Sequence, residues 1–192
     1  MDASDLAVVS RVKAGDHDAF RHLVERHSRS VFRLAYRLTG REEDADDVVQ
    51  ETFLKAFRQL AQFESRSSFG TWLYRITVNC AHDLTRRRPR AGSRTSIDDP
   101  EHGPALQLAD ESATADPMRE LARRQIDARV RAAMGELSAQ ERSAFVMRHY
   151  EGLSIEEIGR VLDLKTSAAK HSVFRAVKKL RRSLEPVAGF ES

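Results

Sequence analysis

Three polar residues near position 50 are spaced so that they share one side of a helix. Asp47, Gln50 and Glu51 stand three and four positions apart, and side chains at this spacing project from the same helix face. Two carboxylates and an amide suit a basic protein partner better than a nucleic acid. The spacing alone fits a solvated helix face equally well, and the residues themselves favour that simpler interpretation.

The other residues able to do chemistry are cationic and fall in two blocks. Residues 66–94 contain seven arginines against one acid, and residues 160–182 contain eight Lys and Arg against one acid. Acidic segments separate the blocks, which indicates two distinct contacts with a polyanion. Because each block ends an amphipathic helical pattern, the arrangement favours nucleic acid.

Residue types that would support catalysis or metal binding occur in unfavourable patterns. His17, His22 and His27 recur every five residues, which spreads them around a helix and argues against a metal site. The single cysteine, Cys80, lies among apolar residues and is expected to be buried. There is no glycine-rich phosphate loop or nucleophile elbow. We therefore expect neither an enzyme nor a bound cofactor or metal.

Composition sets the fold class. The 192 residues are 41% hydrophobic and 32% charged, with only 9 Gly and 5 Pro, which favours an all-α fold over a β-sandwich or barrel. The sequence has no apolar run long enough to span a membrane and no signal-peptide pattern at its start, so a cytoplasmic protein without membrane insertion is expected.

Helical periodicity predicts the elements that position the N-terminal candidates. A short helix before Gly15 precedes a helix over 16–39, capped by Asp16 and ended by Gly40. The next helix runs over 42–60, and a third over 69–88 carries Trp72. The apolar side chains of the 42–60 helix are expected to point into the core: Val48, Val49, Phe53, Leu54 and Phe57.

The C-terminal part shows a helix-turn-helix pattern over 153–180. Ser138 with Glu141, and Ser154 with Glu157, form two capping-box signatures, and a short turn at 163–165 precedes a last helix to about residue 184. Small residues at Gly159, Ala168 and Ala169 would let the two helices cross closely. Base edges in the major groove would meet Ser167, Lys170, His171 and Arg175, whereas Lys178 and Lys179 would hold phosphate.

Between these parts the periodicity is lost. Four of the five prolines fall in residues 89–117, which predicts a flexible linker. The expected organisation is therefore two helical domains, over 10–90 and 118–185, joined by a linker over 91–117, with the helix-turn-helix in the second domain.

Residues 45–57 (ADDVVQETFLKAF) and 69–79 (FGTWLYRITVN) closely resemble the second conserved region of bacterial RNA polymerase sigma factors. Residues 138–180 resemble the fourth region. The small size of the chain, and a linker in place of a helical third region, resemble the extracytoplasmic function (ECF) group. This resemblance implies an alternative sigma factor, which directs core RNA polymerase to promoters by recognising their −10 and −35 elements.

The resemblance also implies roles for individual residues. The face of Asp47, Gln50 and Glu51, with Val48 between them, would dock on the clamp helices of the polymerase β′ subunit, and the fourth region would meet the β flap. The −10 element would meet a set from the 69–88 helix and the loop before it: Ser67, Ser68, Trp72, Arg75, Asn79, Arg86, Arg87 and Arg88. The resemblance also implies an anti-sigma factor as partner.

Two departures from the family pattern affect DNA recognition. Leu73 follows Trp72 where primary sigma factors have a second aromatic residue, so strand separation should depend more on a well-matched promoter. Residues 167–172 read SAAKHS where many relatives read GTVKSR, which predicts a different −35 preference. Trp72 itself fits a core position and a DNA-facing position about equally.

Two other classes of function remain at this point. One is a stand-alone helix-turn-helix regulator whose N-terminal half senses a signal or dimerises. The other is an interaction protein that titrates a partner. The acidic face at residues 47–51 beside the Trp72 helix favours the sigma factor, because a repressor needs neither feature.

Overall fold

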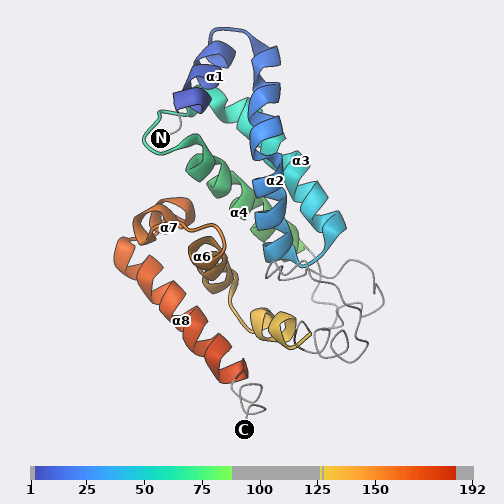
Figure 1. Cartoon of the computed structure of the whole chain (residues 1–192), viewed down its shortest axis with the longest axis vertical. Helices are drawn as coiled ribbons and strands as arrows, with labels where there is room; N and C mark the ends of the chain where they lie inside the picture. Colours follow the sequence, from blue (N-terminus) through green and yellow to red (C-terminus); the bar gives the residue numbers. More distant parts are fainter. Residues whose placement is uncertain (1–2, 88–125, 127, 185–192) are drawn as a thin grey trace, which may run out of the picture.

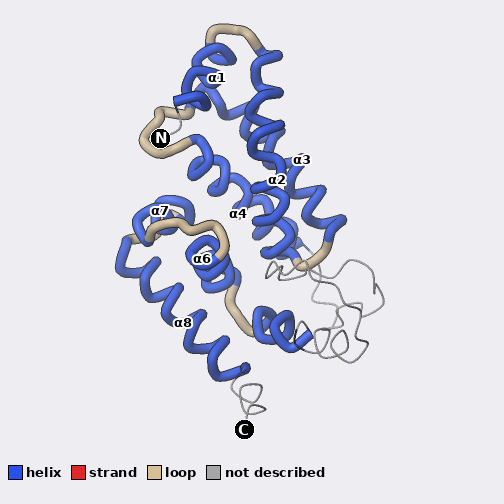
Figure 2. Tube along the Cα trace, viewed as in Figure 1, coloured by secondary structure: helices blue, strands red, loops and turns tan. Residues whose placement is uncertain are grey.

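The computed structural model describes residues 3–87, 126 and 128–184. Every regular element in these ranges is a helix, as the composition predicts (Figures 1 and 2). The N-terminal helices form one group and the C-terminal helices another, with α6 and α7 on the side nearer the first group. The expected linker over 91–117 and Arg88 lie outside the described residues.

Four helices make the N-terminal group: α1 (Ala3–Lys13), α2 (Phe20–Thr39), α3 (Glu42–Gln59) and α4 (Phe69–Arg87). Short 3₁₀ turns, η1 (His17–Ala19) and η2 (Leu60–Gln62), precede α2 and follow α3. Asp16 accepts a hydrogen bond from the Ala19 amide, so the predicted cap starts a 3₁₀ turn that leads into α2. Gly40 ends α2 with φ of 76°, a conformation that glycine adopts without strain.

The predicted inward face of α3 is partly wrong. Val48 and Phe53 are buried, but Leu54 and Phe57 are 45% and 41% exposed. The core face of α3 instead passes through Thr52, Phe53 and Ala56. Leu54 follows Asp47 by seven positions and Phe57 follows Gln50 by seven, so both lie along the side of the helix that carries these polar residues. The Phe57 ring also packs edge-on against Phe20 and His17. Hydrophobic type alone did not distinguish the two faces.

The C-terminal group contains a helical segment at 128–135, then α6 (Ala139–His149), α7 (Ile155–Leu162) and α8 (Thr166–Leu184). Both predicted capping boxes are present, Ser138 with Glu141 and Ser154 with Glu157. Asp163 ends α7 in the left-handed region, at φ 56°. A Cβ built on Gly159 would lie 2.9 Å from the Leu164 carbonyl oxygen, so this position needs glycine for the tight α7–α8 turn.

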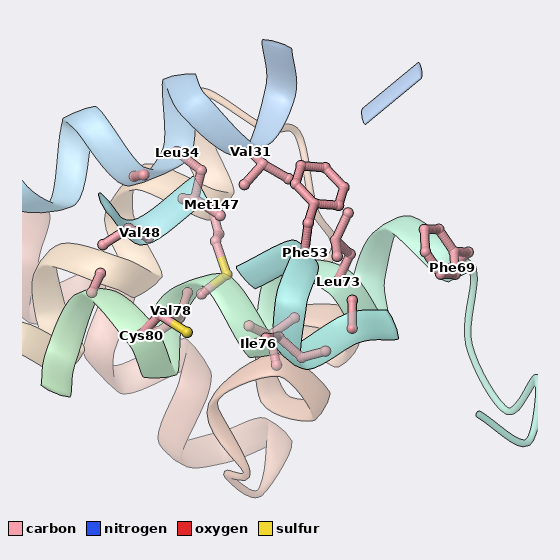
Figure 3. Close-up of a cluster of buried hydrophobic side chains, with 14 of the residues drawn as sticks. Val31, Leu34, Val48, Phe53, Phe69, Leu73, Ile76, Val78, Cys80 and Met147 are labelled. Carbon is pink, nitrogen blue, oxygen red and sulfur yellow. The ribbon is translucent and has the colours of Figure 1, made fainter. Parts of the chain in front are cut away.

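The two groups share one hydrophobic core. Val146 and Met147 of α6, both fully buried, belong to the same cluster as Leu34 of α2 and Val78 of α4. Figure 3 shows Met147 among side chains of the N-terminal helices. A smaller cluster, Ala133, Leu137, Ala176 and Leu180, joins the 128–135 segment to α8. The described parts of the two expected domains are therefore packed against each other.

Candidate functional site

The acidic face of α3 is at the surface. Asp47, Gln50 and Glu51 are exposed, and Glu51 forms an ion pair with Lys55 one turn later, at 3.3 Å. Leu54 and Phe57 continue this face toward the end of the helix, so a polar patch runs into an apolar one. Such a combination is typical of a protein-binding surface.

Val48 does not belong to this face. Its side chain is 1% exposed and packs in the core. One position along a helix turns the side chain by about 100°, which carries Val48 away from the direction of Asp47. The expected contact of Val48 with a partner is therefore corrected: the residue holds α3 against the core and so positions the polar side chains.

The aromatic cluster at the start of α4 explains the position of Trp72. Its ring lies 5.2 Å from that of Phe63 and 5.6 Å from that of Phe69, measured between centroids. Phe63 and Phe69 are buried, whereas Trp72 is half-buried. Trp72 thus packs on the core with one part and reaches the surface with the other.

The loop before α4 ends in a hydrogen-bonded serine. The Ser68 hydroxyl accepts from the Thr71 amide at 3.1 Å, in the manner of an N-cap, and lies 2.8 Å from the Thr71 hydroxyl. Ser67 is half-exposed and donates to the Ser68 carbonyl oxygen. Ser65 adopts φ of 56°. Ser68 therefore orders the loop, and Ser67 remains accessible beside it.

The remaining described candidates on α4 lie toward its exposed side: Arg75, Asn79, Arg86 and Arg87. Asn79 and Arg86 line an open cavity of about 610 Å³ between α3, α4 and the start of α6. Lys55 lines it too. Cys80, the residue after Asn79, is buried as expected and is a free thiol; burial raises its pKa.

The outer face of α8 collects the expected base-reading residues. Ser167, Lys170, His171 and Arg175 are all exposed, and their spacing of three, four and eight positions places them on one face. The opposite face is buried through Ala169, Ser172, Ala176 and Leu180. The absence of an arginine at position 172 has a structural reason, because Ser172 is buried and hydrogen-bonded to Gln140 at 2.7 Å.

Sequence reasoning missed Phe174. Its side chain is 65% exposed, in the middle of the basic face of α8. The ring is available to a partner between Lys170 and Lys178, and apolar side chains are able to contact the thymine methyl group in the major groove. The signal was present in the sequence, because Phe174 follows Ser167 by seven positions.

The two lysines expected to hold phosphate differ in their surroundings. Lys178 is exposed. Lys179 donates to the Glu141 carboxylate at 2.7 Å and so ties α8 to α6. Burial opposes the charge on Glu141, but the hydrogen bonds from Lys179 and Ser138 outweigh it and lower the pKa of this carboxyl. Lys179 is thus already paired within the protein.

Polar contacts join the two groups of helices. The Glu151 carboxylate, which is 5% exposed, accepts from Arg37 of α2 at 2.8 Å and from the Tyr74 hydroxyl of α4 at 2.9 Å. Burial and the neighbouring Glu151 charge raise the pKa of Tyr74 to about 12, so its hydroxyl stays protonated and donates. His82 of α4 lies 2.9 Å from the buried Ser143 hydroxyl of α6.

Comparison with known proteins identifies both halves. Residues 23–91 match the family model for sigma-70 region 2, and residues 127–180 match that for sigma-70 region 4. None of the helices in the described residues is both long and apolar enough to cross a bilayer.

Characterised relatives match over nearly the whole chain. The RNA polymerase sigma-H factor of Pseudomonas aeruginosa is 34% identical over 185 residues, covering 95% of each chain. The ECF RNA polymerase sigma-E factor of Haemophilus influenzae is 34% identical over 187 residues, covering 96% of this chain and 97% of the relative. The structure of CnrH, solved with the cytosolic domain of CnrY, matches with a TM-score of 0.67 at 28% identity, over 94% of this chain and 96% of CnrH. The chain belongs to the sigma-70 family, and within it to the ECF group of alternative sigma factors, which direct transcription to specific promoters.

Proposed function

We propose that this sigma factor contacts core polymerase and promoter DNA mainly through three separate helices, α3, α4 and α8. The exposed face of α3, formed by Asp47, Gln50 and Glu51, docks on the clamp helices of the polymerase β′ subunit. Its polar character and the adjoining Leu54 and Phe57 support a protein partner for this face.

The start of α4 and its exposed side meet the −10 element. Ser67 and Trp72 stand at the surface beside Asn79, and Arg75, Arg86 and Arg87 supply positive charge. A half-exposed indole provides a stacking surface for an unpaired base, and polar groups in a loop can read the edge of an extruded base. Arg88 is assigned to the same contact from the sequence.

The outer face of α8 reads the −35 element, and the C-terminal domain also meets the β flap. This assignment is supported by the exposed row of Ser167, Lys170, His171, Phe174 and Arg175 on a helix whose other side is buried. The N-terminal half of such a helix fits the major groove, with the exposed Lys178 toward the phosphates. Lys179 would join this contact only by leaving the Glu141 carboxylate. The functional domains are then residues 10–90 and 118–185, joined by 91–117.

The observation that carries the proposal is the opposite character of two exposed faces on one chain. The α3 face is acidic and apolar, which DNA would repel, whereas the α8 face is basic. A protein that only binds an operator has no use for the first.

The test adds purified protein to core polymerase and follows transcription from genomic DNA fragments. We expect promoter-specific initiation that depends on both the protein and the polymerase. If no fragment gains specific initiation while the protein alone protects an operator from cleavage, the protein is instead a stand-alone regulator. Capture of another protein without any effect on DNA would favour the titration function.

A protein partner beyond the polymerase is part of the proposal. CnrH was solved in complex with the cytosolic domain of CnrY, and we infer that this chain is likewise held by an anti-sigma factor. Catalysis would belong to the polymerase, the sigma factor itself being neither an enzyme nor a cofactor carrier. The polymerase also sets the place of action in the cytoplasm. Co-purification from cells tests the anti-sigma partner directly.

A further inference from the structure

The contact between the two groups of helices has the features of a releasable joint. It combines a buried apolar centre, to which α6 contributes Val146 and Met147 and α7 contributes Ile158 and Val161, with a polar border. In that border Glu151 accepts two hydrogen bonds from two different N-terminal helices, through Arg37 and Tyr74. Interfaces of mixed polarity within one chain resemble transient protein–protein contacts, for which relative motion is expected.

The hydrogen bonds to Glu151 use both oxygens of its carboxylate. Each oxygen of the Glu151 carboxylate has its own donor, at 2.8 and 2.9 Å. The Arg37 guanidinium also lies 4.5 Å from the centre of the Tyr150 ring, a cation–π contact. On the same border Arg142 donates to the Leu38 carbonyl oxygen at 3.2 Å. A carboxylate this buried is stable only while its donors are in place.

The closed arrangement conflicts with the size of a promoter. A compact chain of 192 residues has a radius of gyration of about 16 Å, which corresponds to a body about 40 Å across. The centres of the −10 and −35 elements are about 25 base pairs apart, which is about 85 Å of B-form DNA at about 3.4 Å per base pair. The α4 and α8 surfaces cannot reach both elements while the two groups of helices stay packed together.

We propose that the Arg37–Glu151–Tyr74 contact is an intramolecular latch that holds the free protein closed and must break before both promoter elements are bound. The proposal rests on the proposed function for its consequence in transcription, but the closed state of the free protein is a property of the chain alone. Polymerase binding supplies the free energy that opens the latch, so the contact lowers the apparent affinity for the polymerase.

The first measurement is a distance within the full-length free protein. Spin labels at Glu25→Cys on α2 and Arg181→Cys on α8, both exposed positions, report the separation of the two groups in a Cys80→Ala background. The latch variant combines Tyr74→Phe with Glu151→Gln, which removes the hydroxyl donor and the charge with little change in shape. We expect one short distance in the parent protein and an added population of long distances in the variant.

The second measurement is the affinity for core polymerase, where the variant should bind about tenfold more tightly. Asp16→Asn is the matched control, because Asp16 also bonds an arginine and a second donor but lies wholly within the N-terminal group. It should change neither the distance nor the affinity.

The outcomes separate the latch from the proposed function. An unchanged distance distribution in the variant overturns the latch. If the variant shows long distances but does not bind polymerase more tightly, the latch does not lower the affinity for the polymerase. If neither the parent nor the variant binds polymerase, the proposed function fails, while the distances still decide whether Glu151 holds the chain closed.

Discussion

At the scale of single residues, exposure separates neighbouring side chains that are available to a partner from those that hold the fold. Asp47 and Val48 are adjacent in sequence, yet the first is exposed and the second is 1% exposed. On α8 the same alternation separates Arg175 from Ala176. Substitutions on the exposed members should therefore change binding and leave stability almost unaltered.

Replacing Asp47 and Gln50 by alanine should weaken binding to core polymerase, because both side chains belong to the proposed α3 docking face. Titration with labelled core polymerase measures the effect. Glu25→Ala, which removes an exposed carboxylate from α2, serves as the control and should bind like the parent protein. Unchanged affinity in the double variant would remove this face from the interface.

Replacing Phe174 by alanine should alter −35 sequence preference while leaving the free energy of unfolding within about 0.5 kcal/mol of the parent. The reason is its 65% exposure, which leaves little packing to lose.

Replacing Lys178 should instead weaken binding of all DNA sequences alike and reduce the salt dependence of binding by about one counterion. Binding to a library of duplexes at two salt concentrations distinguishes these effects, and a uniform loss in the Phe174 variant would contradict base reading.

At the scale of elements, the sequence predicted local structure well and long-range structure poorly. Capping boxes at Ser138 and Ser154 were predictable because donor and acceptor stand three residues apart. The inward face of α3 was assigned partly wrongly, because Leu54 and Phe57 have the same hydrophobicity as core residues. The contacts of Glu151 lie 114 and 77 positions away in sequence, and no local pattern indicates such pairs.

Replacing Gly159 by alanine should destabilise the helix-turn-helix by about 1–3 kcal/mol, since the new Cβ would approach a backbone oxygen that cannot move aside. Thermal unfolding measures the loss. Gly135→Ala is the matched control, because its Cβ would have no neighbour within 4 Å, and it should leave stability unchanged or raised. Equal effects at the two positions would show that the α7–α8 turn tolerates a side chain.

The α4–α6 contact should weaken in mild acid through His82. Burial is the main cause that lowers the pKa of His82 below its ordinary value of 6.5. Asp83 and Arg86 on α4 and Arg142 on α6 are its charged neighbours. Because the unfolded state takes up the proton first, this contribution to stability is complete above about pH 6.5 and is lost as the pH falls further.

Urea unfolding at pH 7.5 and 5.5 tests this contribution. The glutamine of the His82→Gln variant is able to hydrogen-bond Ser143 but does not titrate. The free energy of unfolding of this variant should therefore fall less between the two pH values than that of the parent protein. An identical fall in both proteins would assign the pH dependence to other groups. The pKa values of Glu141 and Glu157 are lowered from 4.5, and that of Asp83 is lowered from 3.8, so these carboxyls stay charged over this range.

At the scale of the whole molecule, the shared core makes the two groups of helices a single cooperative unit in the closed state. Met147 is fully buried in a cluster whose other members come mainly from α2, α3 and α4. Separation of the two groups would expose this side chain, so unfolding of one group destabilises the other.

The parent protein should therefore unfold in one transition, seen alike by two probes. The single tryptophan, Trp72, lies on α4 of the N-terminal group, whereas far-ultraviolet circular dichroism reports the helices of both groups. The two urea curves should coincide in the parent protein and separate in the Tyr74→Phe, Glu151→Gln variant. Separate curves in the parent protein would show that the groups fold independently.

The position of Glu151 also matters for engineering. A chimera that joins residues 1–90 of this protein to the helix-turn-helix of a relative would acquire a new −35 preference. It would also leave Arg37 and Tyr74 without their acceptor unless the graft carries a carboxylate at the position of Glu151. The graft would then change both the promoter preference and the ease with which the two groups of helices separate. A graft that retains Ser143 and Glu151 changes the promoter preference alone, because both contacts with the N-terminal group are kept.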